Sequence, residues 1–202
     1  KGLIVVVCKA DNETPDELHY TVNKEDDYKT LMAIRRALKS EEEGKLFLTI
    51  DAERAGPITE EHLMGLEKIV YTLNISGDKQ KEPPGSLFDM QQLTELVVEN
   101  TGIRSLPDNF DIAPNMKDCI IQGNKSLTHL SQDFGSHQPE DYETLQHLCL
   151  RDNNLEWQCC DTTAEEFIDR LQHFQSVIVA DLSGNNFTDT AGVSPPASIG
   201  LA

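Results

Sequence analysis

The chain has 202 residues, of which 38% are hydrophobic, and its 35 acidic against 17 basic side chains give a formal net charge of −18. This length and apolar content can form a substantial core in one domain. The acidic excess argues against binding to nucleic acid or to an anionic membrane, because both need an excess of Lys and Arg. No segment is apolar over the ~20 residues that cross a bilayer, so no direct membrane insertion is expected.

Residues 1–44 predict an N-terminal capping segment made of strands and a helix. Residues 3–8 and 18–22 have the composition of two strands. Apolar residues at helical spacing then predict a helix over residues 27–39, namely Leu31, Ile34 and Leu38. The pattern leaves open whether the first strand joins the main sheet or forms a hairpin with the second.

Residues 45–190 repeat one spacing, in which apolar residues at positions one, four and six precede a small polar residue at position nine. Alternation places positions four and six on one face of a short strand, and the ninth residue turns the chain and bonds to neighbouring backbone. Stacked copies bury the apolar edges that one copy cannot bury alone. These structural ladder positions are Asp78, Thr101, Asn124, Asn153 and Asn185.

The later copies are longer than the earlier ones. Successive ladder positions from Asp78 onward are 23, 23, 29 and 32 residues apart. The capping pair Thr163 and Glu166, followed by apolar residues at helical spacing, predicts a helix within the longest interval. Thr59 and the acidic residues after it predict a similar helical turn. Residues 191–202 are predicted to form a flexible tail.

This spacing resembles the signature of the leucine-rich repeat family. The resemblance implies an α/β fold: a solenoid of about five to six repeats with a curved parallel sheet, behind the N-terminal α/β cap. It also implies a recognition module, with members in adhesion, receptor recognition, innate immunity and intracellular scaffolding. Fold does not choose among these roles.

Nothing in the sequence indicates an enzyme. It has no Gly-rich phosphate loop, no His pair at metal-ligand spacing and no nucleophile elbow, so neither catalytic residues nor a cofactor are expected. His147, Cys149, Cys159 and Cys160 could form a zinc cluster, but the first two project from a strand and the others lie beyond the turn. A surface His and ordinary thiols are favoured, and no metal is expected.

In the resembling architecture, strand residues that do not enter the core line a concave face. Its central positions would bring together the apolar residues Val97, Ile120 and Cys149. An apolar centre with a polar rim is typical of protein-binding surfaces, although β-branched residues also suit strands in general. The predicted ligand-binding residues are Val97, Glu99, Ile120, Gln122, His147, Cys149, Arg151 and Asp181.

Glycosylation sequons and cysteines point to different compartments. Four sequons exceed chance and favour an extracellular chain; Asn124 is expected to face inward, which leaves Asn12, Asn74 and Asn186 as predicted glycosylation sites. Five cysteines cannot all pair, and no cysteine-rich cap is present. The first hypothesis is therefore a secreted protein or receptor ectodomain that binds a protein or peptide. The alternative is a cytoplasmic scaffold or regulatory subunit, and a homodimer is left open in both.

Overall fold

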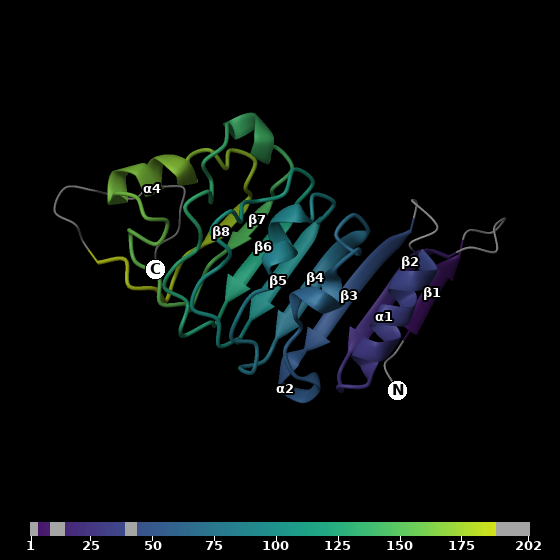
Figure 1. Ribbon diagram of the computed structural model, residues 1–202. Helices are drawn as coiled ribbons and strands as arrows, with labels where there is room; N and C mark the ends of the chain where they lie inside the picture. The colour runs from purple at the N-terminus through teal and green to yellow at the C-terminus, as the bar shows by residue number, and fades with distance from the viewer. Residues whose placement is uncertain (1–3, 9–14, 39–43, 189–202) are drawn as a thin grey trace.

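The structure is a computed structural model that describes residues 4–8, 15–38 and 44–188. Its eight strands form one sheet in which spatial order follows chain order, and they run from one end of the molecule to the other (Figure 1). The strands are β1 (Ile4–Cys8), β2 (Pro15–Val22), β3 (Lys45–Asp51), β4 (Val70–Ser76), β5 (Glu95–Glu99), β6 (Asp118–Gln122), β7 (His147–Cys149) and β8 (Val179–Asp181). β1 pairs antiparallel with β2, and all pairs from β2 to β8 are parallel.

The helices are short apart from the one near the N-terminus. They are α1 (Asp27–Leu38), α2 (Ala52–Ala55), α3 (Glu60–Leu63), α4 (Ala164–Leu171) and the 3₁₀ helices η1 (Gly85–Asp89) and η2 (Pro139–Tyr142). The predicted capping box of α4 is present: the Glu166 N–H donates to Thr163 Oγ1 at 3.2 Å, and the Thr163 N–H donates to Glu166 Oε2 at 3.0 Å. The helices predicted at residues 27–39 and after Thr59 and Thr163 are confirmed.

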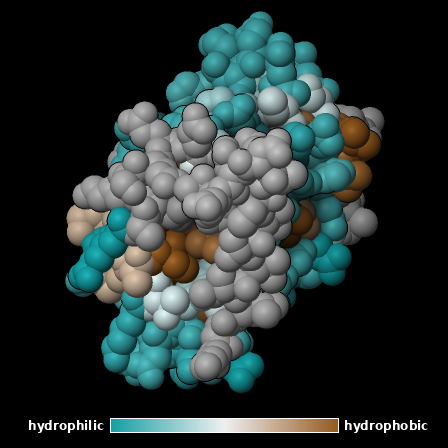
Figure 2. Space-filling view, turned by 90° about the vertical axis from the view of Figure 1, so that its right-hand side faces the viewer, coloured by the Kyte–Doolittle hydropathy of each residue, from teal (hydrophilic) through white to brown (hydrophobic). Residues whose placement is uncertain are grey.

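The N-terminal segment resolves the alternative that the sequence left open. β1 forms a hairpin with β2, in which Val6 lies opposite Leu18. β2 then continues the parallel sheet, because Leu18 pairs with Leu46 of β3. The described part of residues 1–44 therefore contributes one antiparallel and one parallel strand to the sheet. At this end of the molecule, hydrophobic residues come to the surface with hydrophilic residues around them (Figure 2).

A single hydrophobic core runs along one side of the sheet. The apolar repeat positions point into it; in β5, for example, Leu96 is 0% exposed and Val98 3%. Aromatic side chains fill the space under the connecting loops, where the rings of Phe134 and Phe174 meet edge to face at 5.8 Å. Among the described residues, no helix is long and apolar enough to cross a membrane.

Buried asparagines link successive turns of the chain, as predicted. Asn124 is 0% exposed, its Oδ1 accepts from the Thr101 N–H at 2.9 Å, and its own N–H donates to Asn153 Oδ1 at 3.0 Å. At the next turn, Asn185 Oδ1 accepts from the Leu155 N–H at 3.1 Å. Since buried backbone groups need hydrogen-bond partners, these side chains fix the path of the loops.

The prediction that Asp78 belongs to this ladder is wrong. Its side chain is 75% exposed and pairs with Lys81 at 2.7 Å. Gln80, two residues later, is buried instead: its Oε1 accepts from the Ile58 N–H at 2.9 Å and its Nε2 donates to the Ile58 carbonyl at 3.0 Å. The chain turns at Gly77, where φ is +105°, and the longer amide side chain then reaches the neighbouring loop.

Candidate recognition surface on the sheet

The sheet face opposite the core, here called the open face, carries a row of central residues in consecutive register. Their pairing across the strands matches the prediction. Val97 and Ile120 are neighbours at its centre, both half-buried, and Cys149 lies next to Ile120. The complete row is Thr49, Asn74, Val97, Ile120, Cys149 and Asp181.

Polar side chains beside this row bond to one another. Gln122 Nε2 donates to Glu99 Oε2 at 3.1 Å, and Cys149 Sγ donates to Gln122 Oε1 at 3.5 Å. Arg151 Nη1 lies 3.9 Å from Asp181 Oδ2. The structure therefore brings most of the predicted binding residues together beside the apolar centre, in two separate groups of bonded side chains.

Two further features define the chemistry of the rim. His147 is exposed, and its Nδ1 contacts Asp118 Oδ1 on the neighbouring strand. Burial raises the pKa of the Cys149 thiol above its ordinary value, so this thiol is neutral near pH 7. A neutral thiol with an amide neighbour lacks the activation that a nucleophilic cysteine needs.

The open face also carries an aromatic row that the sequence analysis did not identify. The rings of His19 on β2 and Phe47 on β3 stack at 4.4 Å, and the ring of Tyr71 on β4 lies 6.3 Å from that of Phe47. Lys45 Nζ is 5.4 Å from the centre of the Tyr71 ring. The sequence signal was available, because Phe47 stands at an outward position between the inward Leu46 and Leu48.

The predicted glycosylation sites differ in their surroundings. Asn186 is exposed, and its Nδ2 contacts Asn154 Oδ1. Asn74 is half-buried in the middle of β4, and its Oδ1 is buried without a hydrogen-bond partner. Asn12 lies outside the described residues. Asn124 is fully buried, in agreement with the expectation that it faces inward.

The structure shows four free cysteines, namely Cys119, Cys149, Cys159 and Cys160. Cys119 points into the core, and burial raises the pKa of its thiol. The sulfurs of Cys159 and Cys160 are 3.9 Å apart, and both residues are buried. Within the described ranges, no group of three or more His, Cys, Asp or Glu side chains could hold a metal ion, and the imagined zinc cluster is not assembled there.

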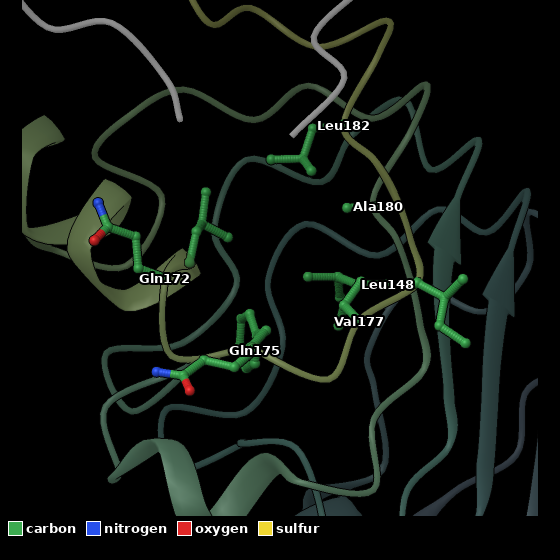
Figure 3. Close-up of a pocket in the computed structure, with 9 residues that line it drawn as sticks. Leu148, Gln172, Gln175, Val177, Ala180 and Leu182 are labelled. Carbon is green, nitrogen blue, oxygen red and sulfur yellow. The ribbon is translucent and has the colours of Figure 1, made fainter. Parts of the chain in front are cut away.

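Two hollows lie at the ends of the sheet. The C-terminal one, about 350 Å³, lies between α4 and the last strands, and Leu148, Val177, Ala180 and Leu182 line it together with Gln172 and Gln175 (Figure 3). The N-terminal one, about 530 Å³, contains the stacked rings of Tyr28 and His62. Two of its basic groups have acidic neighbours, since Lys29 pairs with Asp26 at 2.8 Å and Lys79 lies 3.7 Å from Glu53.

A third hollow, about 380 Å³, is formed around the loop that precedes η2. Asp111 Oδ2 accepts a hydrogen bond from Tyr142 Oη at 2.5 Å and lies 2.6 Å from His137 Nδ1. Asp111 Oδ1 also accepts from the Gly135 N–H at 2.8 Å. The carboxylate is only 10% exposed, so it acts as the centre of a bonded cluster that fixes this loop.

Comparison with known protein families and curated proteins found no match for this chain. The functional conclusion therefore rests on the side chains of the open face.

Proposed function

We propose that the chain is a leucine-rich repeat solenoid that acts as a non-catalytic recognition module. It binds a protein or peptide on the concave side of the sheet, which is the open face, and it works as a secreted protein or receptor ectodomain. The observation that carries this proposal is the apolar centre formed by Val97, Ile120 and Cys149 in adjacent register, within a bonded polar rim. Such a centre and rim are how protein-binding surfaces are built.

The repeat assignment is supported by the strand order and by the asparagine bonds. The strands follow one another in chain order, so each one lies beside its neighbours in sequence, which is the arrangement of a stacked array. The repeated spacing supplies the inward residues, and Asn124 and Asn153 bond consecutive copies. The exposed side chains of the strands are then free to vary with the partner.

The non-catalytic role is supported by the chemistry of the open face. Its polar groups bond to one another, and its cysteine is a neutral thiol. Recognition needs no more than complementary shape, apolar contact and hydrogen bonds. No cofactor is required for it.

Peptide selection tests the binding function directly. Peptides selected from a random twelve-residue phage library against the purified chain should bind on the open face. Ile120→Asn should weaken them at least tenfold, because it replaces an apolar contact with a polar group at unchanged charge. Met64→Asn is the matched control, since Met64 is 55% exposed and lies next to α3. Equal binding to the wild-type chain and the Ile120 variant would contradict the proposal.

The alternative function is an intracellular scaffold or regulatory subunit. The four free cysteines favour it, because reducing compartments keep thiols unpaired. Expression in a secretory host separates the two: a glycan on exposed Asn186 that glycosidase removes would support the extracellular role. An unmodified chain from that host would support the intracellular one.

A further inference from the structure

Two acidic residues occupy neighbouring positions on the open face beside the apolar centre. Glu95 on β5 and Asp118 on β6 stand at paired positions of adjacent strands. Like charges in directly neighbouring strand positions destabilise a sheet. In the described part of the chain the carboxylate of Glu95 has no ion pair or hydrogen-bond partner, and the residue is only half-exposed. His147 contacts Asp118 on the next strand, so of the two carboxylates only that of Glu95 is left without a partner among the described residues.

The same face is acidic overall. Its two basic groups are already paired, since Lys45 lies 3.9 Å from Glu17 and Arg151 lies 3.9 Å from Asp181. Of the other acids, Glu95 and Asp118 lie on one side of the apolar centre and Glu99 lies on the other. His147 contacts Asp118, and Gln122 Nε2 donates to Glu99. The six carboxylate residues of the face are Glu17, Asp51, Glu95, Glu99, Asp118 and Asp181.

Aromatic rings lie on the strands next to Glu95, beyond the small residue Thr72. Phe47, Thr72 and Glu95 occupy consecutive register positions on β3, β4 and β5. Strands are about 4.8 Å apart, so about 10 Å separates the strand that carries the ring from the strand that carries the carboxylate. Thr72 between them has a small side chain that is only half-buried.

We propose that the open face binds a cationic, extended segment of a partner protein; this rests on the proposed function and names its partner class. One Arg or Lys of that segment lies over Thr72, between the rings of Phe47 and Tyr71 and the carboxylates of Glu95 and Asp118. The rings attract the cation through their π faces, and the carboxylates accept its charge-assisted hydrogen bonds. An apolar side chain further along the segment contacts Val97 and Ile120.

The remaining features of the chain favour this partner over other cations. A free polyamine would satisfy the carboxylates and leave the apolar centre uncovered, whereas a protein segment covers both. A metal ion would need three or more ligands, and no such group is present among the described residues. The net charge of −18 also attracts a basic partner at long range and accelerates association at low salt.

The phage selection described above also tests the charge of the partner. Peptides selected against the chain should be enriched in Arg and Lys next to apolar residues. The double variant Glu95→Gln, Asp118→Asn should weaken these peptides at least tenfold in fluorescence anisotropy and reduce the dependence of their affinity on salt. Its melting temperature should change little, because the weakened contact of Asp118 with His147 is offset by the loss of repulsion between the two neighbouring carboxylates.

The matched control is Glu140→Gln, Glu143→Gln, which removes two exposed carboxylates at η2 and should leave peptide binding unchanged. Selected peptides that are neutral or acidic, the absence of any enrichment, or equal loss in the control would overturn the inference. Peptides that respond to Ile120→Asn but not to the double variant would leave the proposed function in place and refute the cationic partner. Peptides that respond to neither would refute both.

Discussion

Asn153→Ala tests whether the buried asparagines hold successive turns of the chain together. Asn153 is 5% exposed and makes four hydrogen bonds. Its Oδ1 accepts from the N–H and from Nδ2 of Asn124 at 3.0 and 3.1 Å, and its Nδ2 donates to the carbonyls of Ile121 and Leu150, both at 2.7 Å. The substitution removes all four bonds and exposes none of these groups to water.

The loss of stability depends on which of these groups keep another hydrogen-bond partner after the substitution. Leu150 still accepts from Asn185 Nδ2 at 2.7 Å, and Asn124 Nδ2 still donates to the Val98 carbonyl at 3.0 Å. The Asn124 N–H, in contrast, keeps no other acceptor among the described residues. An orphaned buried donor costs about 1–3 kcal/mol, and each of the other three bonds contributes about 0.5–1.5 kcal/mol. We therefore expect the free energy of unfolding to fall by about 3 kcal/mol or more.

Urea denaturation followed by circular dichroism measures this change, and Asp78→Ala is the control. Asp78 fits the same sequence position in its repeat, but its exposed side chain contacts only Lys81. Its removal should change the free energy of unfolding by no more than about 0.5 kcal/mol. A loss below about 1 kcal/mol for Asn153→Ala, or equal losses in the two variants, would refute the role of the buried ladder.

Two further outcomes are expected. Asp111 raises the pKa of His137 through their hydrogen bond, so this pair stabilises the fold fully below pH ~6.5 and the contribution disappears as pH rises through the folded-state pKa. The melting-temperature gap between the wild-type chain and His137→Gln should thus shrink from pH 6 to pH 8.5; a constant gap would contradict this. In a secretory host, glycopeptide mapping should find sugar at exposed Asn186 and none at buried Asn124. A glycan at Asn124 would contradict the burial of that residue.

Local patterns in the sequence were sufficient to predict the strands and to tell which of their side chains point inward and which point outward. Alternation along a strand depends only on the backbone, so Leu96 and Val98 had to share one face and Val97 had to occupy the other. Register then brought Val97, Ile120 and Cys149 together, because their strands are paired without an offset along the repeated spacing of the sequence. The capping box at Thr163 was equally local and was identified for the same reason.

The tertiary structure decided the features that depend on how separate segments meet. Asp78 and Gln80 both follow β4, and only the path of the loop after Gly77 selects the one that reaches Ile58. The cluster of His137 and Tyr142 with Asp111 joins residues more than 25 positions apart, and no repeat spacing encodes it.

The direction of the first strand and the neighbouring side chains on the open face also depend on how the segments pack. An apolar strand can pair in either direction, so the sequence of β1 did not reveal its hairpin with β2. The aromatic row and the neighbouring positions of Glu95 and Asp118 exist only once the strands lie side by side. The sequence by itself therefore determined which residues fold the chain, because burial follows local alternation. Only the tertiary structure determined which exposed residues act together, because that depends on contacts between strands distant in sequence.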